Sequence, residues 1–205
     1  MKPVQIAQIV FIVAASLAVY SFVRAAQTDH RRSSCQALCH MRPAYAGQER
    51  RVPDFELPDA SGKMVRFSSF LGKAPVVLNF WTKTCRPCLE EMPSLAELAE
   101  IMAEDGVKVV TICTDEGPEA VKDVLQVALK GKPPPFVILY DSDSKVVGDK
   151  FGTTLFPETW LIDEHGVIRV LIDGAKDWSE AMQREAIEMI SKPSGCPLQF
   201  ERGRP

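Results

Sequence analysis

The chain has 205 residues, of which 46% are hydrophobic and 25% are charged. This length and apolar content fit one globular domain with extensions at its ends. The formal net charge of -3 gives no electrostatic basis for binding nucleic acid, and the arginines between residues 24 and 51 are expected to be solvated.

An uncharged, mostly apolar segment of twenty residues extends from Val4 to Val23, which is long enough as a helix to cross a bilayer. Lys2 before this segment and Val23-Arg24-Ala25 at its end also fit a secretory signal with a cleavage site. Residues 1–24 are therefore predicted to be a signal peptide or a membrane anchor, and both alternatives stay open.

The side of the membrane is indicated by two opposing signals. Arg24, Arg31 and Arg32 follow the apolar segment while Lys2 alone precedes it, which the positive-inside rule reads as a cytoplasmic C-terminus. Six cysteines behind a hydrophobic N-terminus instead favour an oxidising compartment. We expect a periplasmic protein, either membrane-anchored or secreted.

Three further regions follow the apolar segment. Residues 25–51 are polar and lack hydrophobic periodicity, which is typical of a tether. Residues 52–192 carry the regular patterns of a folded domain, and residues 193–205 form a tail.

The domain begins with a predicted hairpin over 53–67, with a turn at Asp59-Ala60-Ser61-Gly62. A buried strand over 75–81 leads into a helix whose apolar positions run from Leu89 to Met102 and which closes at Gly106. Pro93 is expected to kink this helix. The next elements are a strand at 107–113, a helix at 120–129 and a strand at 136–140.

The last part of the domain changes to an antiparallel pattern. Strands at 159–162 and 167–172 flank the tight turn Asp163-Glu164-His165-Gly166, and a helix over about 179–190 closes the domain. Parallel units followed by an antiparallel pair predict an α/β fold with a mixed central sheet flanked by helices.

The Cys85-Arg86-Pro87-Cys88 motif lies where the strand at 75–81 passes into the helix. Residues i and i+3 share one helix face, so the two sulfurs are close enough for a disulfide. The helix N-terminus stabilises a thiolate at Cys85, with Lys83 and Arg86 adding positive charge. Cys85 is therefore the predicted nucleophile, and Cys88 is placed to resolve the mixed disulfide.

Two plainer interpretations of the motif are a static disulfide and half of a zinc site. The zinc site would need two more ligands, and the candidates Cys35, Cys39 and His40 lie more than forty residues upstream in the tether. The strand–helix–strand context favours the redox interpretation, and no metal is expected.

The stretch from Asn79 to Pro93 resembles the active-site segment of the TlpA/ResA/CcmG-like (DsbE-like) membrane-tethered thioredoxins. Pro53-Asp54-Phe55 and Phe156-Pro157-Glu158-Thr159 are similar to two further signatures of that family. The resemblance covers most of residues 52–192 and implies a thioredoxin-like fold. It implies a thiol-disulfide oxidoreductase acting as a disulfide reductant in cytochrome c maturation.

The same resemblance implies a set of partners and substrate-binding residues. The partners would be protein thiols or disulfides, including apocytochrome c, together with an upstream membrane electron donor, and no cofactor other than the Cys85–Cys88 disulfide is expected. Pro157 is implied to be cis and to face the cysteines. The implied substrate-binding residues are Trp81, Arg86, Pro87, Phe156 and Pro157.

Three positions qualify the resemblance. Asn79 stands where thioredoxins proper carry a buried aspartate, and Thr84 stands where many relatives have tryptophan. Glu91 matches an acidic position of the tethered reductants, and we expect it to tune the thiol pKa values or to accept a proton. The alternative is that Glu91 is an ordinary solvated helix residue.

The remaining cysteines have less specific interpretations. Cys113 ends an apolar strand and is expected to be a buried, unreactive thiol. Cys35 or Cys39 could pair with Cys196, although spacing does not fix the connectivity. Cys35 to His40 also differs by one residue from the haem-attachment pattern C-x-x-C-H.

Two other functions compete with disulfide exchange. A peroxiredoxin-like thiol peroxidase would share the entry hairpin, and Thr82-Lys83-Thr84-Cys85 imitates its T-x-x-C, but Leu78 stands where that class has proline. A copper-binding or copper-delivery module would use the thiolates of Cys85 and Cys88 for Cu(I), although His165 lies in a distant turn.

Overall fold

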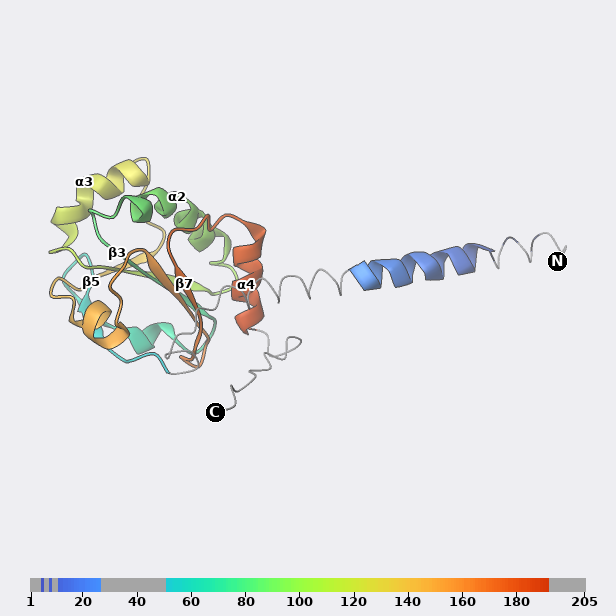
Figure 1. Ribbon diagram of the computed structural model, residues 1–205, viewed down its shortest axis with the longest axis horizontal. Helices are drawn as coiled ribbons and strands as arrows, with labels where there is room; N and C mark the ends of the chain where they lie inside the picture. The colour runs from blue at the N-terminus through green and yellow to red at the C-terminus, as the bar shows by residue number, and fades with distance from the viewer. Residues whose placement is uncertain (1–4, 6–7, 9–10, 27–50, 192–205) are drawn as a thin grey trace. The chain divides into compact units, whose positions relative to one another are not determined.

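The computed structural model describes residues 5, 8, 11–26 and 51–191. The chain divides into two compact units, Met1–His40 and Met41–Pro205. In the first unit, residues 11–26 form a helix (Figure 1). None of the helices described is long and apolar enough to cross a membrane, so the expected membrane span is not confirmed. Cys35, Cys39 and Cys196 lie outside the described residues.

The second unit is built on a five-stranded sheet with the order β5-β4-β3-β6-β7. β3 pairs in parallel with β4, and β4 pairs in parallel with β5, whereas β6 is antiparallel to both β3 and β7. The bounds are β3 (Val76–Trp81), β4 (Lys108–Cys113), β5 (Val137–Tyr140), β6 (Glu158–Ile162) and β7 (Ile168–Asp173). This mixed sheet confirms the predicted α/β architecture.

The described residues of this unit form three α-helices: α2 (Arg86–Ile101), α3 (Pro118–Ala128) and α4 (Ala181–Ser191). α2 connects β3 to β4 and α3 connects β4 to β5, so two parallel crossovers of the same sense bring both helices to one face of the sheet (Figure 1). α2 continues through Pro93, which is exposed on its outer side.

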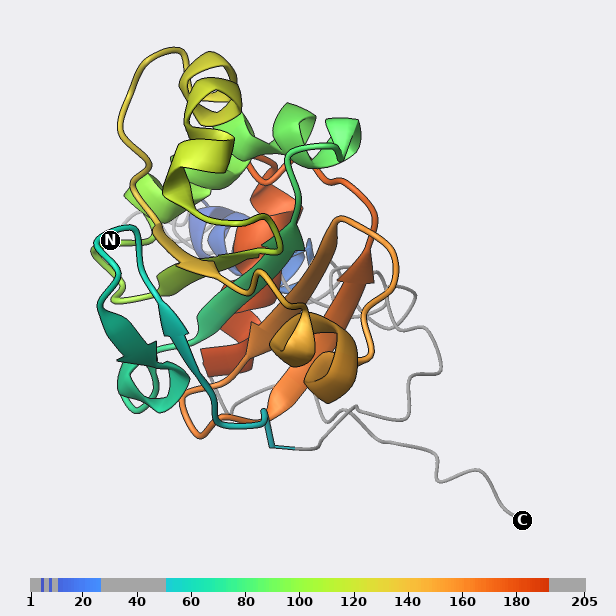
Figure 2. The same cartoon turned by 90° about the vertical axis from the view of Figure 1, so that its left-hand side faces the viewer.

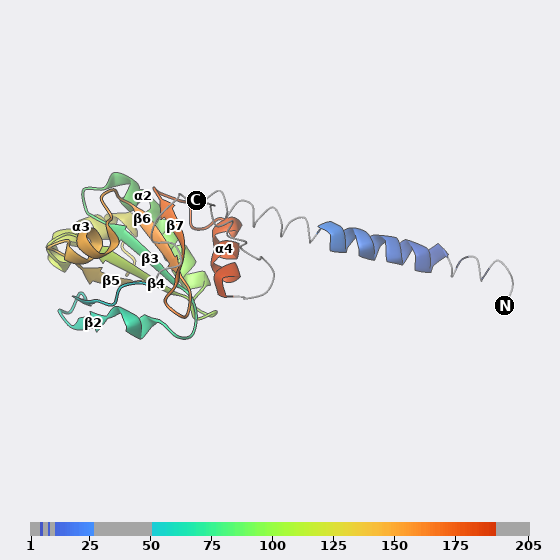
Figure 3. The ribbon, with the colours of Figure 1, turned by 60° about the horizontal axis from the view of Figure 1, so that its bottom comes forward.

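The opposite face of the sheet is covered by smaller elements. These are the hairpin of β1 (Glu56–Pro58) and β2 (Met64–Arg66), and the short helices η1 (Phe67–Phe70) and η2 (Lys145–Phe151). Figure 2 shows η2 in front of the sheet, and Figure 3 shows the hairpin and α2 on opposite sides of it. The sequence did not predict η2.

The alternation of side chains along β3 divides its residues between the two faces. Val76, Leu78 and Phe80 belong to the apolar core that includes Phe67 of η1 and Phe151 of η2. Asn79, one position out of phase, faces α2, where its side chain donates a hydrogen bond to Glu91. The strand that leads into the cysteine pair is therefore fixed by packing on one side and by polar contacts on the other.

The described part of this unit begins at the far end of the sheet from the cysteine pair. Arg51 forms a β-bridge with Val167, and the Val52 N–H donates to the Gly166 carbonyl at 2.8 Å. Both contacts are made to the turn between β6 and β7. The Cys85–Cys88 pair follows the opposite end of β3.

Candidate functional site

Cys85 and Cys88 form a disulfide at the N-terminus of α2, with 5.3 Å between their Cα atoms. Cys85 is the N-cap residue, and its sulfur accepts a hydrogen bond from the Cys88 N–H at 3.2 Å. Cys85 is partly exposed, whereas Cys88 is fully buried. An incoming sulfur can therefore reach Cys85 but not Cys88.

The two cations near Cys85 are both engaged by carboxylates. Arg86 Nε lies 2.7 Å from Glu90 Oε1, and Lys83 Nζ lies 3.0 Å from Glu116 Oε2. Each carboxylate offsets the charge of its partner, so the positive field expected from Lys83 and Arg86 is weaker than their sequence positions suggest. The helix N-terminus and the Cys88 N–H remain as the groups that stabilise a Cys85 thiolate.

Glu91 is buried one helical turn after Cys88, with an exposed fraction of 4%. Its Oε1 accepts from Asn79 Nδ2 at 2.9 Å, and its Oε2 accepts from the Lys176 N–H at 3.0 Å and from Trp178 Nε1 at 3.2 Å. Burial raises the pKa of this carboxyl, against the opposing effect of these hydrogen bonds. The solvated-surface alternative for Glu91 is therefore wrong.

Asn79 joins Glu91 to the sheet. Its Nδ2 also donates to Thr159 Oγ1 at 2.9 Å, and its Oδ1 is buried with no hydrogen-bond partner within the described part of the chain. β3 thus carries an amide rather than a carboxylate at Asn79, and Glu91 brings a buried carboxyl next to it from α2. The role of Glu91 toward the thiols stays a prediction.

The Phe156–Pro157 peptide bond is cis, as the family resemblance implied. Phe80 is paired with Glu158 between β3 and β6, so the next pair along places Pro157 beside Trp81, at the end of the sheet where the cysteine loop begins. Pro157 is buried, and its carbonyl accepts from the Gly174 N–H at 2.9 Å. Phe156 is partly buried against the core.

The other residues expected to bind substrate divide into two groups. Arg86 and Pro87 are exposed beside Cys85, where a substrate can contact them. Trp81 is fully buried, and its Nε1 donates to Thr111 Oγ1 at 3.2 Å. The expected substrate contact of Trp81 is therefore wrong, because a core indole has no surface to offer.

Sequence reasoning missed two residues that define the surroundings of the site. Trp178 packs over Glu91 from the loop after β7, and Asp115 lies under the loop that carries Thr82 and Lys83. Asp115 follows the carboxyl end of the parallel strand β4, a place where functional groups gather in such sheets, and this signal could have identified it. No three His, Cys, Asp or Glu side chains among the residues described are grouped as a metal site.

A disulfide of this spacing at the head of a helix, with a cis-proline just before the neighbouring strand β6, is typical of the thioredoxin-like fold. The chain belongs to the AhpC/TSA family, which matches residues 49–171. It is also similar to ResA thiol-disulfide oxidoreductases, as its active-site segment led us to expect.

The ResA protein of Bacillus thuringiensis (strain Al Hakam) is 35% identical over 120 residues, which is 58% of this chain and 65% of the relative. The match therefore spans just under two thirds of that relative's length. ResA of Bacillus subtilis (strain 168) is 30% identical over 139 residues, covering 68% of this chain and 73% of the relative.

The fold is also shared with the solution structure of a thiol:disulfide interchange protein from Bacteroides sp. Its TM-score is 0.57 at 22% identity, and the match covers 70% of this chain and 90% of that chain.

Proposed function

We propose that the protein is an extracytoplasmic reductant of disulfides in other proteins, with Cys85 as the attacking thiol and Cys88 as the resolving thiol. The observation that carries this proposal is the difference in exposure within one disulfide, since only Cys85 is open to a partner. The similarity to ResA thiol-disulfide oxidoreductases supports the same reaction class.

The reaction requires no group outside the chain and its substrate. The Cys85 thiolate attacks one sulfur of the substrate disulfide, and the other substrate sulfur leaves as a thiolate. Cys88 then loses its proton and attacks the Cys85 sulfur of the mixed disulfide, which releases the second substrate thiol. Two electrons pass to the substrate, and the Cys85–Cys88 disulfide is restored.

Glu91 is the group we propose for handling the proton of Cys88. Both side chains are buried on the same face of α2, three residues apart, where neighbouring side chains approach to about 5–6 Å between Cβ atoms. A carboxyl whose pKa is raised by burial is nearer to the pH at which a thiol exchanges its proton. Asn79 and Trp178 hold this carboxyl in place.

We propose a substrate with a disulfide that must be reduced outside the cytoplasm, and apocytochrome c is the candidate that the family resemblance supplies. The oxidised protein would then be returned to its dithiol by a membrane electron donor. The apolar segment before residue 24 supports export or anchoring. A C-terminal reporter that works only in the cytoplasm tests this location, and activity of that reporter would contradict it.

Cysteine trapping tests the assignment of the two thiols. The Cys88→Ala variant should accumulate a mixed disulfide with a disulfide-bonded substrate protein, because the first step is intact and the second is blocked. The Cys85→Ala variant is the matched control and should accumulate none, because the thiol of Cys88 is buried. The reverse pattern would exchange the two roles.

The midpoint potential of the Cys85–Cys88 pair tests the direction of electron flow. A potential near or below that of thioredoxin, about -270 mV, is expected for a reductant, whereas one near -120 mV would identify a disulfide donor. Consumption of hydrogen peroxide by the reduced protein would favour the thiol peroxidase instead.

A further inference from the structure

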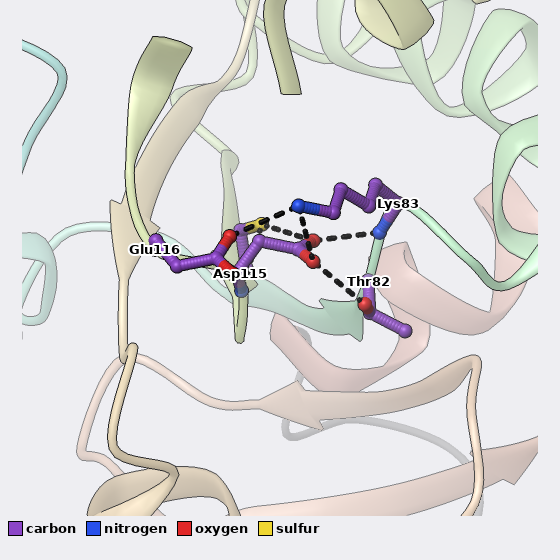
Figure 4. Close-up of polar contacts among 5 residues, drawn as sticks. Thr82, Lys83, Asp115 and Glu116 are labelled. Atoms are coloured by element: carbon purple, nitrogen blue, oxygen red, sulfur yellow. Dashed lines mark hydrogen bonds and ion pairs between the residues drawn. The ribbon is translucent and has the colours of Figure 1, made fainter. Parts of the chain in front are cut away.

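A buried carboxylate, Asp115, lies beneath the loop that leads into Cys85 and is 8% exposed. Its Oδ2 accepts hydrogen bonds from the Lys83 N–H at 2.6 Å and from the Cys113 thiol at 3.2 Å. Its Oδ1 accepts from the Thr82 hydroxyl at 3.1 Å. Figure 4 shows these donors converging on one side chain.

The Cys113 thiol stays protonated and donates a hydrogen bond to Asp115. It is fully buried, and burial raises its pKa far above its ordinary value. The sulfur therefore keeps its proton at neutral pH and keeps donating it to Asp115. Cys113 is thus unreactive, as the sequence suggested, but it has a structural contact of its own.

Asp115 also shares a cation with a second carboxylate. Lys83 Nζ lies 3.9 Å from Asp115 Oδ1 and 3.0 Å from Glu116 Oε2. The side chain of Glu116 is 78% exposed, whereas that of Asp115 is 8% exposed. Water screens the exposed pair strongly, so the buried carboxylate has the larger effect on the charges around it despite the longer distance.

The loop transmits the position of Asp115 directly to the redox pair. The Cys85 N–H donates to the Thr82 carbonyl at 3.1 Å, so the residue held by Asp115 through its hydroxyl also holds the N-cap of α2. Asp115 thus holds Thr82 and Lys83 directly, and it holds Cys85 indirectly through the Thr82 carbonyl.

We propose that Asp115 is a positioning residue for Cys85, which fixes the turn before the attacking sulfur and balances the Lys83 charge next to it. The inference rests on the proposed function, because Cys85 matters as the attacking thiol. The other charged groups nearby are Arg86 with Glu90 on α2, and Glu91 behind Cys88. The positive charge of Lys83 stabilises the Cys85 thiolate, and the negative charge of Asp115 offsets part of this effect. We therefore expect the Cys85 thiolate to be less stable with Asp115 present than without it.

The test is the Asp115→Asn variant of the full chain in its reduced form. The amide oxygen still accepts from the Lys83 N–H, so the change removes mainly the negative charge. We expect the pH midpoint for alkylation of Cys85 to fall by about half to one unit, which is a threefold to tenfold change in acid dissociation constant. Fragmentation of the peptide that contains Cys85 and Cys88 in mass spectrometry separates the two thiols, and the peptide itself separates them from the other cysteines.

Two variants serve as controls. Glu116→Gln removes the exposed partner of Lys83, and its shift should be in the same direction but much smaller. Lys83→Met leaves Asp115 without its cation and should move the midpoint upward. The inference is overturned if Asp115→Asn matches the wild type, or if Glu116→Gln shifts the midpoint as far as Asp115→Asn does.

The remaining outcomes are also decisive. If Asp115→Asn does not fold, Lys83→Met decides, and an unchanged midpoint in that variant overturns the inference. The midpoint is measured without a substrate, so it is independent of the trapping result. Failure of Cys88→Ala to trap a substrate would contradict the proposed function while leaving the effect of Asp115 on Cys85 measurable.

Discussion

Replacing Glu91 by alanine would remove the acceptor of three donors at once, two of them buried and one partly buried. These are Asn79 Nδ2, the Lys176 N–H and Trp178 Nε1, which lie 2.9–3.2 Å from the carboxylate oxygens. A buried donor left without an acceptor costs about 1–3 kcal/mol. Taking the lower value for each donor, Glu91→Ala should lower the free energy of unfolding by about 3 kcal/mol.

Glu91→Gln is the matched control, because the surrounding residues can adapt to it. If the Asn79 amide turns over, its unpartnered Oδ1 takes the place of Nδ2. That oxygen can then accept from the new side-chain NH2 and from the Thr159 hydroxyl, while the new amide oxygen still accepts from Lys176 and Trp178. The turned-over Nδ2 of Asn79 then lies where Oδ1 had no partner, so its two buried N–H groups lose their acceptors. Glu91→Gln should therefore cost about 1–2 kcal/mol, which is less than the loss for Glu91→Ala.

The wild type and Glu91→Gln should differ in how the free energy of unfolding depends on pH. Burial raises the pKa of Glu91 above its ordinary value of 4.5. Between that value and the raised one, the native state binds the proton and the unfolded state does not. Wild-type stability therefore falls as pH rises through this window. Glu91→Gln lacks this loss, so its stability relative to the wild type should increase over the same window.

Urea unfolding of the oxidised protein, followed by tryptophan fluorescence between pH 4 and pH 8, measures both effects. An alanine variant within about 0.5 kcal/mol of the wild type would refute the count of unpaired donors. A difference between Glu91→Gln and the wild type that does not change with pH would refute the burial argument.

Two further predictions follow from residues of the same unit. Glu91→Gln should make the thiol nearest to it more acidic, because a neighbouring negative charge opposes a thiolate, and superimposable titrations of thiolate absorbance against pH would remove Glu91 from the chemistry. Gly166→Ala should cost about 1–2 kcal/mol for the left-handed backbone, at φ +77°, and more because the new Cβ would lie 2.9 Å from Leu71 Cδ1. Gly62→Ala, with φ +82° and open space around it, is the control in thermal unfolding, and equal losses in the two variants would show that the Leu71 contact has no effect.

The hydrophobic patterns predicted most of the regular structure because each strand and helix buries one continuous set of side chains. β3 extends over Val76–Trp81 and α2 over Arg86–Ile101, close to the ranges expected from the sequence. The disulfide of the Cys-x-x-Cys pair could also be predicted from the sequence, since its two cysteines are near neighbours in the chain. Its place at the head of α2 follows from local structure alone.

The features that the sequence did not predict depend on polar contacts rather than on hydrophobic periodicity. η2 begins where the Asp141 carboxylate accepts from the N–H groups of Val146 and Val147, a local capping contact that hydrophobic periodicity does not report. Glu91 lies on the buried face of α2 with Cys88 and Leu95, but its polarity left a solvated position open as an alternative. Contacts with Asn79, Lys176 and Trp178, of which the last is eighty-seven positions along the chain, make that burial tolerable.

Arg51 and Val52 are attached to the turn between β6 and β7, at the end of the sheet opposite to the Cys85–Cys88 pair. Arg51 Nη1 donates to the His165 carbonyl at 2.8 Å, which fastens the incoming chain at this end of the sheet. The six residues of β3 then span about 20 Å before the cysteine loop begins. A protein joined to the chain at Arg51 would therefore be attached at the end of the sheet opposite to the disulfide.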